Sequence, residues 1–409
     1  MNQLDPLKRT ARAVLERASA YAPAHNDARK VIRIEKRTTP RIVEPSRPHL
    51  DAAINWLKKA QDSSGTGGVA WGYRARRPIR SDLAMGWIAP YPETTGYIIP
   101  TIFRYADTTG DEEYIDRAHR MTVWELSIQL ADGGFQGGVL GSSPVTSSTF
   151  VTGQVIFGLL AAYERFRESK ILDGAVRAGE FLLRCMDEEG RFVTGYSHFC
   201  APGMKAYEVR TGLALAKLGD LIGDQRFRAA ASRIADYALN VQQSNGWFGE
   251  NDLDMHDCPL THTIGYVLEG LSGIGEQMKR SDCTEAVRRT LDSIIPLIRT
   301  DGFFAGRWRS NWTASVNWAC LTGSAQIAGI FLRMYALTSE RDYFDAGRRL
   351  LGFVCFTSDL NVGVPTIDGG IRGSYPFGGT YGQWCILNWA TKFFADSVMD
   401  YLEIQTLQT

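Results

Sequence analysis

The chain has 409 residues, 44% of them hydrophobic, and 45 Lys and Arg balance 45 Asp and Glu to a net charge of zero. This composition can bury a large core, and no apolar run is long enough to predict a membrane-spanning helix. The first residues lack the apolar core of a secretion signal, and the seven cysteines have no regular spacing. We therefore expect reduced thiols and a cytoplasmic protein, and nothing indicates a nucleic-acid ligand.

The first 47 residues form a basic arm, with 11 Lys or Arg against 5 Asp or Glu. Leu4, Leu7, Val14 and Leu15 give it a helical amphipathic pattern, with basic side chains beside them. One interpretation is a segment that docks on an anionic membrane surface or on a partner. The alternative is an arm that lies on the acidic outer surface of the remaining domain, residues 48–409.

That domain is marked by glycine-aromatic loops at a fixed interval. Gly134, Gly190, Gly246 and Gly302 are 56 residues apart, and similar loops lie at 67–71 and 368–371. A second series, Thr-Gly at 95–96, 152–153, 211–212 and 322–323 with Ile-Gly at 264–265, opens helix-length segments between the loops. A repeat with one turn signal per period predicts an array of one supersecondary unit.

Each period contains two predicted helices. The first is apolar nearly all round and the second has one apolar stripe, which is typical of a buried inner helix followed by a half-exposed outer helix. In chain order, an outer helix is expected at 50–61, inner helices near 93, 150, 207, 261, 321 and 384, and further outer helices near 112, 172, 225, 283 and 341.

These helices predict an all-α fold, an (α/α)6 toroid of six hairpins. Five outer helices follow the inner ones, so the sixth is supplied by residues 50–61, and the N-terminal outer helix closes the ring with the C-terminal inner helix. An open helical solenoid is the alternative. It is disfavoured because neither terminal repeat has the polar face of a cap.

The glycine loops lead into the N-termini of all six inner helices, so we expect a funnel on this face. Converging helix N-termini also favour an anionic group. Candidate catalytic residues open these helices or lie in the last loop: Glu93, Tyr207, Arg210, His262, Tyr266, Asp368 and Arg372. Glu93 either stabilises a helix dipole or acts as an acid or base, and His262 either packs in the core or acts together with Tyr266 one turn later.

Candidate substrate-binding residues are aromatic, basic and acidic side chains of the same loops. Aromatic rings stack on sugar faces and Arg binds a carboxylate, although the same rings also stiffen long loops. The candidates are Trp71, Tyr97, Trp247, Asp254, Arg307, Trp308, Trp312, Tyr375 and Tyr381.

Five motifs, at 91–97, 259–266, 320–326, 369–374 and 388–394, resemble a bacterial family of α/α-toroid proteins associated with exopolysaccharide pathways. That family is related in fold to six-hairpin glycosidases and polysaccharide lyases. The resemblance covers about residues 48–400 and implies a carbohydrate substrate, without a set of catalytic residues to carry over.

The Asp-Gly-Gly-Phe loop is also similar to repeats of terpene cyclases and protein prenyltransferases. The acid motif of the cyclases is absent, and Asp252-Leu253-Asp254 repeats it only in part. Zinc ligands would have to come from Asp257, Cys258 and a histidine, without the usual short cysteine spacing. No metal and no cofactor are therefore expected.

Three carbohydrate reactions stay open. A hydrolase needs two facing carboxylates, for which Glu93, Asp132, Asp254 and Asp368 are candidates. A uronate lyase needs a Tyr or His base and an Arg for the carboxylate, and a uronyl C5-epimerase needs similar groups on both sugar faces. We predict an enzyme that cleaves or modifies an acidic poly- or oligosaccharide. A non-catalytic polysaccharide-binding or assembly protein is the alternative from another class.

Overall fold

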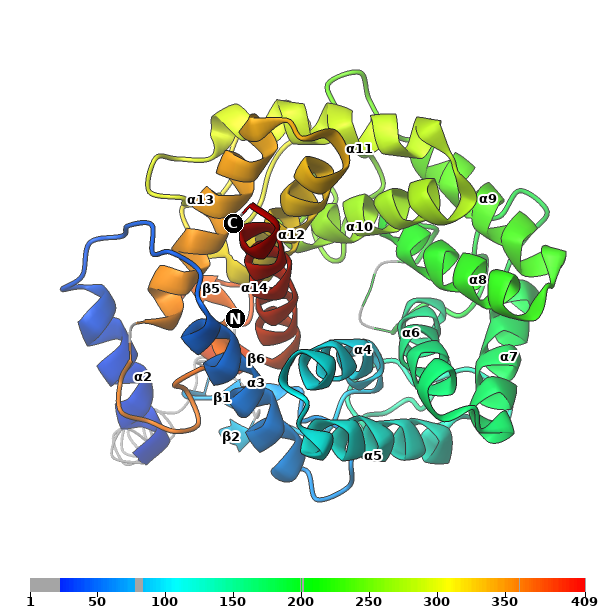
Figure 1. The fold of residues 1–409 in the computed structure, drawn as a ribbon, viewed down its shortest axis with the longest axis horizontal. Helices are drawn as coiled ribbons and strands as arrows, with labels where there is room; N and C mark the ends of the chain where they lie inside the picture. Colours follow the sequence, from blue (N-terminus) through cyan, green and yellow to red (C-terminus); the bar gives the residue numbers. More distant parts are fainter. Residues whose placement is uncertain (1–22, 78–83, 199, 201, 360, 409) are drawn as a thin grey trace, which may run out of the picture.

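The computed structural model describes residues 23–408 except 78–83, 199, 201 and 360. Two concentric sets of helices form a ring (Figure 1). The inner helices are α4 (Pro92–Thr109), α6 (Thr149–Phe166), α8 (Val209–Ile222), α10 (Thr261–Met278), α12 (Leu321–Thr338) and α14 (Asn388–Gln408). The outer helices are α3 (Arg47–Asp62), α5 (Glu112–Ile128), α7 (Ser169–Arg184), α9 (Gln225–Asn240), α11 (Ser281–Ile294) and α13 (Arg341–Ser358).

The ring closes where the sequence predicts. Helix α3 packs against α14, and its Trp56 donates a 2.9 Å hydrogen bond to the carbonyl of Thr366, in the segment that follows α13. Thr101 on α4 donates a 2.8 Å hydrogen bond to Asp396 on α14. The first outer helix and the last inner helix therefore lie together (Figure 1), and the fold is the predicted (α/α)6 toroid.

The glycine loops have a common packing role. Gly302 has a φ of +83°, and a Cβ atom there would lie 2.2 Å from the carbonyl oxygen of Arg349 on outer helix α13. The last loop repeats this contact around the ring, because a Cβ at Gly369 would lie 2.6 Å from the carbonyl of Ala52 on α3. Each of these loops passes so close to the next outer helix that only a glycine fits at the point of contact.

The loop face contains short strands that were not predicted from the sequence. The strands β1 (Gly72–Arg74), β2 (Gly86–Trp87), β4 (Ile371–Arg372) and β6 (Cys385–Leu387) form an antiparallel sheet in the order β2-β1-β6-β4, and β3 (Ala319–Cys320) pairs with β5 (Ser374–Tyr375). In the first sheet Gly72 pairs with Leu387. The last inner helix begins at Asn388, after β6, and the predicted start near residue 384 is wrong.

The described part of the arm lies against the ring. Helix α2 (Pro23–Glu35) is followed by an extended segment in which Val43 donates a 3.0 Å hydrogen bond to Gly352 on α13. Glu44 pairs with Arg348 at 2.9 Å, so this contact places an acidic arm residue on a basic ring residue. The predicted amphipathic residues 4–15 lie outside the described part of the chain. No described helix is long and apolar enough to cross a membrane.

Candidate active site

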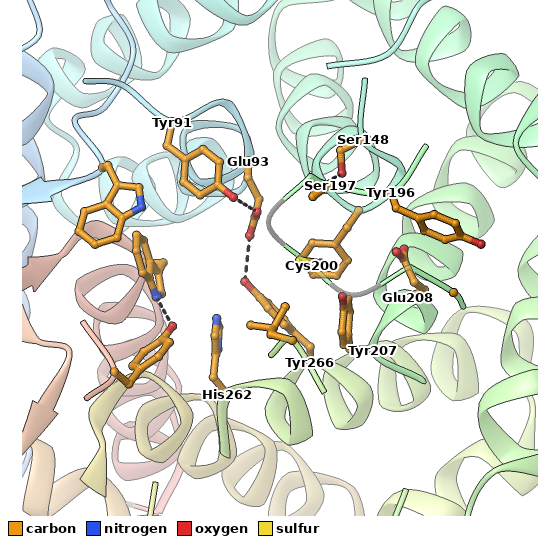
Figure 2. Close-up of a pocket in the computed structure, with 16 residues that line it drawn as sticks. Tyr91, Glu93, Ser148, Tyr196, Ser197, Cys200, Tyr207, Glu208, His262 and Tyr266 are labelled. Carbon is orange, nitrogen blue, oxygen red and sulfur yellow. Dashed lines mark hydrogen bonds between the residues drawn. The ribbon is translucent and has the colours of Figure 1, made fainter. Parts of the chain in front are cut away.

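A cavity of about 270 Å³ lies on the loop face, at the N-termini of inner helices (Figure 2). Its described lining combines aromatic rings, two glutamates, one histidine and a few small polar groups. The lining residues are Trp71, Tyr91, Glu93, Ser148, Phe150, Tyr196, Ser197, Cys200, Gly203, Tyr207, Glu208, Leu253, His262, Tyr266, Tyr381 and Trp389. The predicted funnel is therefore present. Among the predicted residues, Glu93, Tyr207, His262, Tyr266, Trp71 and Tyr381 line it.

Glu93 enters the cavity from the first turn of α4. Pro92 occupies the first helical position, where its missing N–H costs nothing, and this places the next side chain at the helix mouth. Tyr91 and Tyr266 donate hydrogen bonds of 2.6 and 3.2 Å to the two carboxylate oxygens. Burial raises the pKa of Glu93, while the two phenols and nearby Arg210 oppose this rise. The two phenols and Arg210 thus stabilise the anion of Glu93, although burial outweighs them and the pKa stays raised.

Glu208 is the second carboxyl group of the cavity, and it comes from the short 3-10 helix η1 (Ala206–Glu208) that precedes α8. Within the described part of the chain, its oxygens accept hydrogen bonds from Thr149 at 3.3 Å and Thr211 at 3.1 Å, both neutral. Burial raises the pKa of Glu208 to about 8, and the charge of Glu93 adds to the rise. Glu208 is therefore protonated at neutral pH. The anion of Glu93, by contrast, has stronger hydrogen-bond donors than the anion of Glu208 would have.

His262 is the second residue of α10 and lies beside Tyr266, with 4.2 Å between the ring centroids. Burial lowers the pKa of His262 to about 4, so its imidazole is neutral at physiological pH. Burial also raises the pKa of Tyr207 and Tyr266 well above the usual value. These phenols keep their protons and act as hydrogen-bond donors.

Two further predicted residues lie beneath the cavity. The hydroxyl of Tyr97 is 3.5 Å from that of Tyr266, and Tyr97 is buried. Arg210 donates a 2.8 Å hydrogen bond from Nε to Glu269 on α10, and its guanidinium lies 5.2 Å from the centroid of the Tyr266 ring. Arg210 does not line this cavity and belongs to the lining of a separate one, together with Tyr97.

The structure does not bring Asp368 and Arg372 to the described lining. Asp368 accepts two 2.8 Å hydrogen bonds from the backbone N–H groups of Val362 and Val364, and so shapes its own loop. Arg372 is buried, donates to the carbonyl of Thr357 at 2.8 Å, and lies 3.7 Å from Glu35 of the arm. Their positions favour structural roles in place of the predicted catalytic ones.

The remaining predicted binding residues stiffen the long loops. Arg307 forms hydrogen bonds of 2.9 and 2.8 Å to the two oxygens of Asp254. Trp312 packs edge-on against Trp247 at 5.1 Å and contacts Trp308 at 6.3 Å. Tyr375 packs edge-on against Phe353 at 5.4 Å. None of these side chains belongs to the described lining of the cavity.

Sequence reasoning missed several lining residues. Glu208 stands next to Tyr207, and its place at the mouth of an inner helix, like that of Glu93, is the signal that could have found it. Trp389 lies within one of the five motifs and donates a 2.8 Å hydrogen bond to the hydroxyl of Tyr381. Tyr91 begins another of these motifs, whereas Phe150 and Tyr196 had no signal beyond being aromatic residues near a helix mouth or in a loop.

One group of side chains in the described part of the chain has the spacing of metal ligands: Glu250, Asp252 and His256. The ammonium of Lys205 lies 3.0 Å from Asp252 and 3.9 Å from Glu250. This lysine already supplies a positive charge to both carboxylates, so the group is an ion-pair cluster at the edge of the loop face. Cys258 of the possible zinc set is not among the three.

The chain matches no protein-family model and no curated protein sequence. Its fold does match solved structures. An unsaturated glucuronyl hydrolase specific for heparin aligns with a TM-score of 0.68 and 15% identity, over 88% of this chain and 97% of that chain.

Two further solved structures have the same architecture. The unsaturated glucuronyl hydrolase of Bacillus sp. GL1 aligns with a TM-score of 0.64 and 14% identity, over 86% of this chain and 95% of that one. Cellobiose 2-epimerase from Bacillus thermoamylovorans aligns with a TM-score of 0.65 and 12% identity, over 87% and 100%. At these identities the likeness concerns the fold, and this chain has the α/α-toroid fold found in glycosidase structures.

Proposed function

We propose that this protein is a glycoside hydrolase that removes a terminal sugar from an acidic oligosaccharide. The proposal rests on one observation: two buried carboxyl groups with different hydrogen-bond partners face one aromatic cavity. Among the described residues, Glu93 accepts from two phenols and Glu208 accepts from two threonine hydroxyls. Such a difference separates an acid from a base at one pH, and glycoside hydrolysis requires that pair.

Each carboxyl group then has a role. Protonated Glu208 gives its proton to the glycosidic oxygen as the bond from this oxygen to the anomeric carbon breaks. Ionised Glu93 takes a proton from the water molecule whose oxygen bonds to that carbon. The rings of Trp71, Trp389 and Tyr381 supply the apolar surface on which a sugar stacks. A cavity of about 270 Å³ is small for a ligand site, which favours one terminal sugar over an internal segment of a polymer.

The motifs that resemble exopolysaccharide-pathway toroid proteins imply a carbohydrate substrate, and two arguments favour an acidic sugar. The helices α4, α6 and α10 direct their N-termini at the cavity, and helix N-termini favour anions. Solved structures of similar fold include unsaturated glucuronyl hydrolases. Because the cysteine usage is typical of a reducing compartment, we place this reaction in the cytoplasm.

Elimination is the second candidate, because His262 also faces the cavity (Figure 2). A neutral imidazole is able to take the C5 proton of a uronate, and a phenol such as Tyr266 is able to protonate the leaving oxygen. Replacing His262 by Ala should then abolish turnover and leave the fold intact. If the variant keeps the wild-type rate, elimination through this residue is excluded.

The decisive experiment uses acidic oligosaccharides with saturated and with unsaturated uronate ends. Reducing ends and the ultraviolet absorbance of the unsaturated uronate are followed together. New reducing ends without a gain in absorbance, lost in Glu208→Gln, support hydrolysis. A gain in absorbance supports elimination and overturns the proposal. Binding of the oligosaccharides without any product supports the non-catalytic alternative and overturns it as well.

A further inference from the structure

A buried chain of polar side chains continues from His262 away from the cavity. The Nδ1 atom of His262 lies 2.5 Å from Oε1 of Gln326 on α12. Both residues are buried, with 4% and 2% of their surface exposed. An amide oxygen only accepts hydrogen bonds, so Nδ1 must carry the proton of the neutral imidazole.

The orientation of the Gln326 amide is itself fixed. Its nitrogen lies 3.4 Å from Oε2 of Glu269 on α10, and the same oxygen accepts the 2.8 Å hydrogen bond from Arg210. A carboxylate accepts only, so the nitrogen end of the amide must face Glu269 and its oxygen end must face His262. The chain of contacts thus selects one amide orientation and one imidazole tautomer.

A glycine makes room for this arrangement. A Cβ atom at Gly265 would lie 2.9 Å from Oε1 and 3.0 Å from Cδ of Gln326. Gly265 is the member of the Thr-Gly series that carries Ile in place of Thr, and its missing side chain lets the Gln326 amide reach the first turn of α10. Any larger residue there would displace the amide from His262.

Burial keeps the imidazole neutral, although the hydrogen bond to Gln326 raises its pKa. Tyr266 lies beside it on α10, Tyr381 faces it from the loop before β6 at 5.8 Å, and Cys320 accepts from its backbone N–H. Glu269 and Arg210 act on it from behind with opposite signs, and burial outweighs both. With Nδ1 protonated, Nε2 is left with a lone pair.

We propose that Gln326 is a positioning residue that holds His262 with the lone pair of Nε2 available to the cavity, where it accepts a hydrogen bond from a sugar hydroxyl. This inference rests on the proposed function. It also deepens that function, because the group that meets His262 must be a donor. A uronate carboxylate has only acceptors, so it binds elsewhere in the cavity, with the sugar ring oriented accordingly.

The test combines nitrogen NMR of the histidine side chains with kinetics. In the free wild-type protein, the His262 signals, assigned by their loss in His262→Gln, should show a neutral ring protonated at Nδ1. In Gln326→Met the ring should lose this single tautomer. Gln326→Glu should raise the pKa of His262, because a carboxylate stabilises the imidazolium. An unchanged tautomer and pKa in both variants would overturn the inference.

Kinetics separate this inference from the proposed function. Gln326→Met should lower kcat/KM by about tenfold or more, as expected for a lost buried hydrogen bond. Gln243→Met, an exposed glutamine between α9 and α10, is the matched control and should keep the wild-type rate. If neither the wild-type protein nor any variant cleaves an oligosaccharide, the proposed function fails. The NMR experiment still tests the tautomer of His262 in that case. If cleavage occurs and Gln326→Met matches wild type, the positioning role fails.

Gly265→Ala gives an independent check without changing a polar group. Its methyl group should displace the Gln326 amide, so the His262 signals should change as in Gln326→Met. A folded Gly265→Ala protein with wild-type histidine signals would also contradict the inference.

Discussion

Tyr91 donates a 2.6 Å hydrogen bond to one oxygen of Glu93, two residues later in the chain, while Tyr266 on α10 donates to the other oxygen. Burial above all raises the pKa of both phenols well beyond the usual value, and the charge of Glu93 adds to this. They therefore remain donors at neutral pH. These two donors stabilise the anion of Glu93, which burial disfavours. One donor directly precedes α4 and the other lies on α10.

Replacing Tyr91 by Phe should raise the pKa of Glu93, because one of the two donors to its anion is lost. If ionised Glu93 is the base, the acidic limb of the kcat/KM profile should move to higher pH, and the rate at neutral pH should fall about tenfold. The measurement is a pH–rate profile of both proteins. Tyr163→Phe, on α6 away from the cavity, is the control. An unmoved acidic limb would show that Glu93 is not the titrating base.

Glu208 should limit activity at the other end of the pH range. Its pKa is raised to about 8, so the wild-type rate should fall as the pH rises through this value and the acid loses its proton. Glu208→Gln should lower kcat by about a hundredfold or more at neutral pH. Glu112→Gln, an exposed glutamate in the first turn of α5, should retain the wild-type rate. A basic limb that persists in Glu208→Gln would assign it to another group.

The same carboxyl group should lower stability at high pH. Between the ordinary pKa of 4.5 and about 8, the folded protein holds a proton that the unfolded chain has lost. The free energy of unfolding therefore falls as pH rises through this window, and it levels off above it. Glu208→Gln should be a few kcal/mol more stable than wild type above pH 8 and little changed at pH 4, by denaturant titration. Equal stability of the two proteins at high pH would contradict the buried acid.

The ring was predictable because its signals are local and repeated. A glycine loop that must cross the next outer helix, as at Gly302 and Arg349, recurs once per unit and leaves a visible period in the sequence. The strands were not predictable, because Gly72 pairs with Leu387 from the other end of the chain and neither segment has a strand pattern of its own.

The candidate site was predictable at its helix mouths and, through Trp71 and Tyr381, at two of its loops. Glu93, His262 and Tyr266 line the cavity because they occupy first or second turns of inner helices, and these positions can be read from the repeat. Arg372 lies in a glycine loop and was therefore predicted to be catalytic. Its neighbour is Glu35 of the arm, and no local sequence pattern connects these two residues. Glu208 has the same signal as Glu93, a place at the mouth of an inner helix, but the burial that raises its pKa is a tertiary feature that no local pattern shows.

The packing role of the glycine loops predicts unequal effects for two glycines with similar backbone angles. Gly302 and Gly363 have φ values of +83° and +70°, but only Gly302 has a neighbour that a Cβ atom would strike. Gly363→Ala should cost about 1 kcal/mol through its left-handed backbone. Gly302→Ala should cost about 3 kcal/mol or more, because the loop must also move away from α13. Denaturant titrations compare the two, and equal losses would contradict the contact.

The arm should contribute to stability through Glu35. Its side chain is 5% exposed, lies 3.7 Å from Arg372, and accepts a 2.9 Å hydrogen bond from the backbone N–H of Phe377. Glu35→Ala removes a buried partner of a buried guanidinium, so the free energy of unfolding should fall by about 3 kcal/mol. Glu44→Ala removes an arm carboxylate that is half exposed, and it should cost about 1 kcal/mol or less.

The kinetic result for Glu35→Ala decides between two roles of Arg372. Since neither Glu35 nor Arg372 lines the described cavity, the folded variant should keep the wild-type kcat. A loss of kcat without a loss of stability would restore the catalytic role predicted from the sequence. A loss of stability alone would mean that the arm has a structural role. Its Glu35 would then hold the last glycine loop on the ring through the buried contact with Arg372.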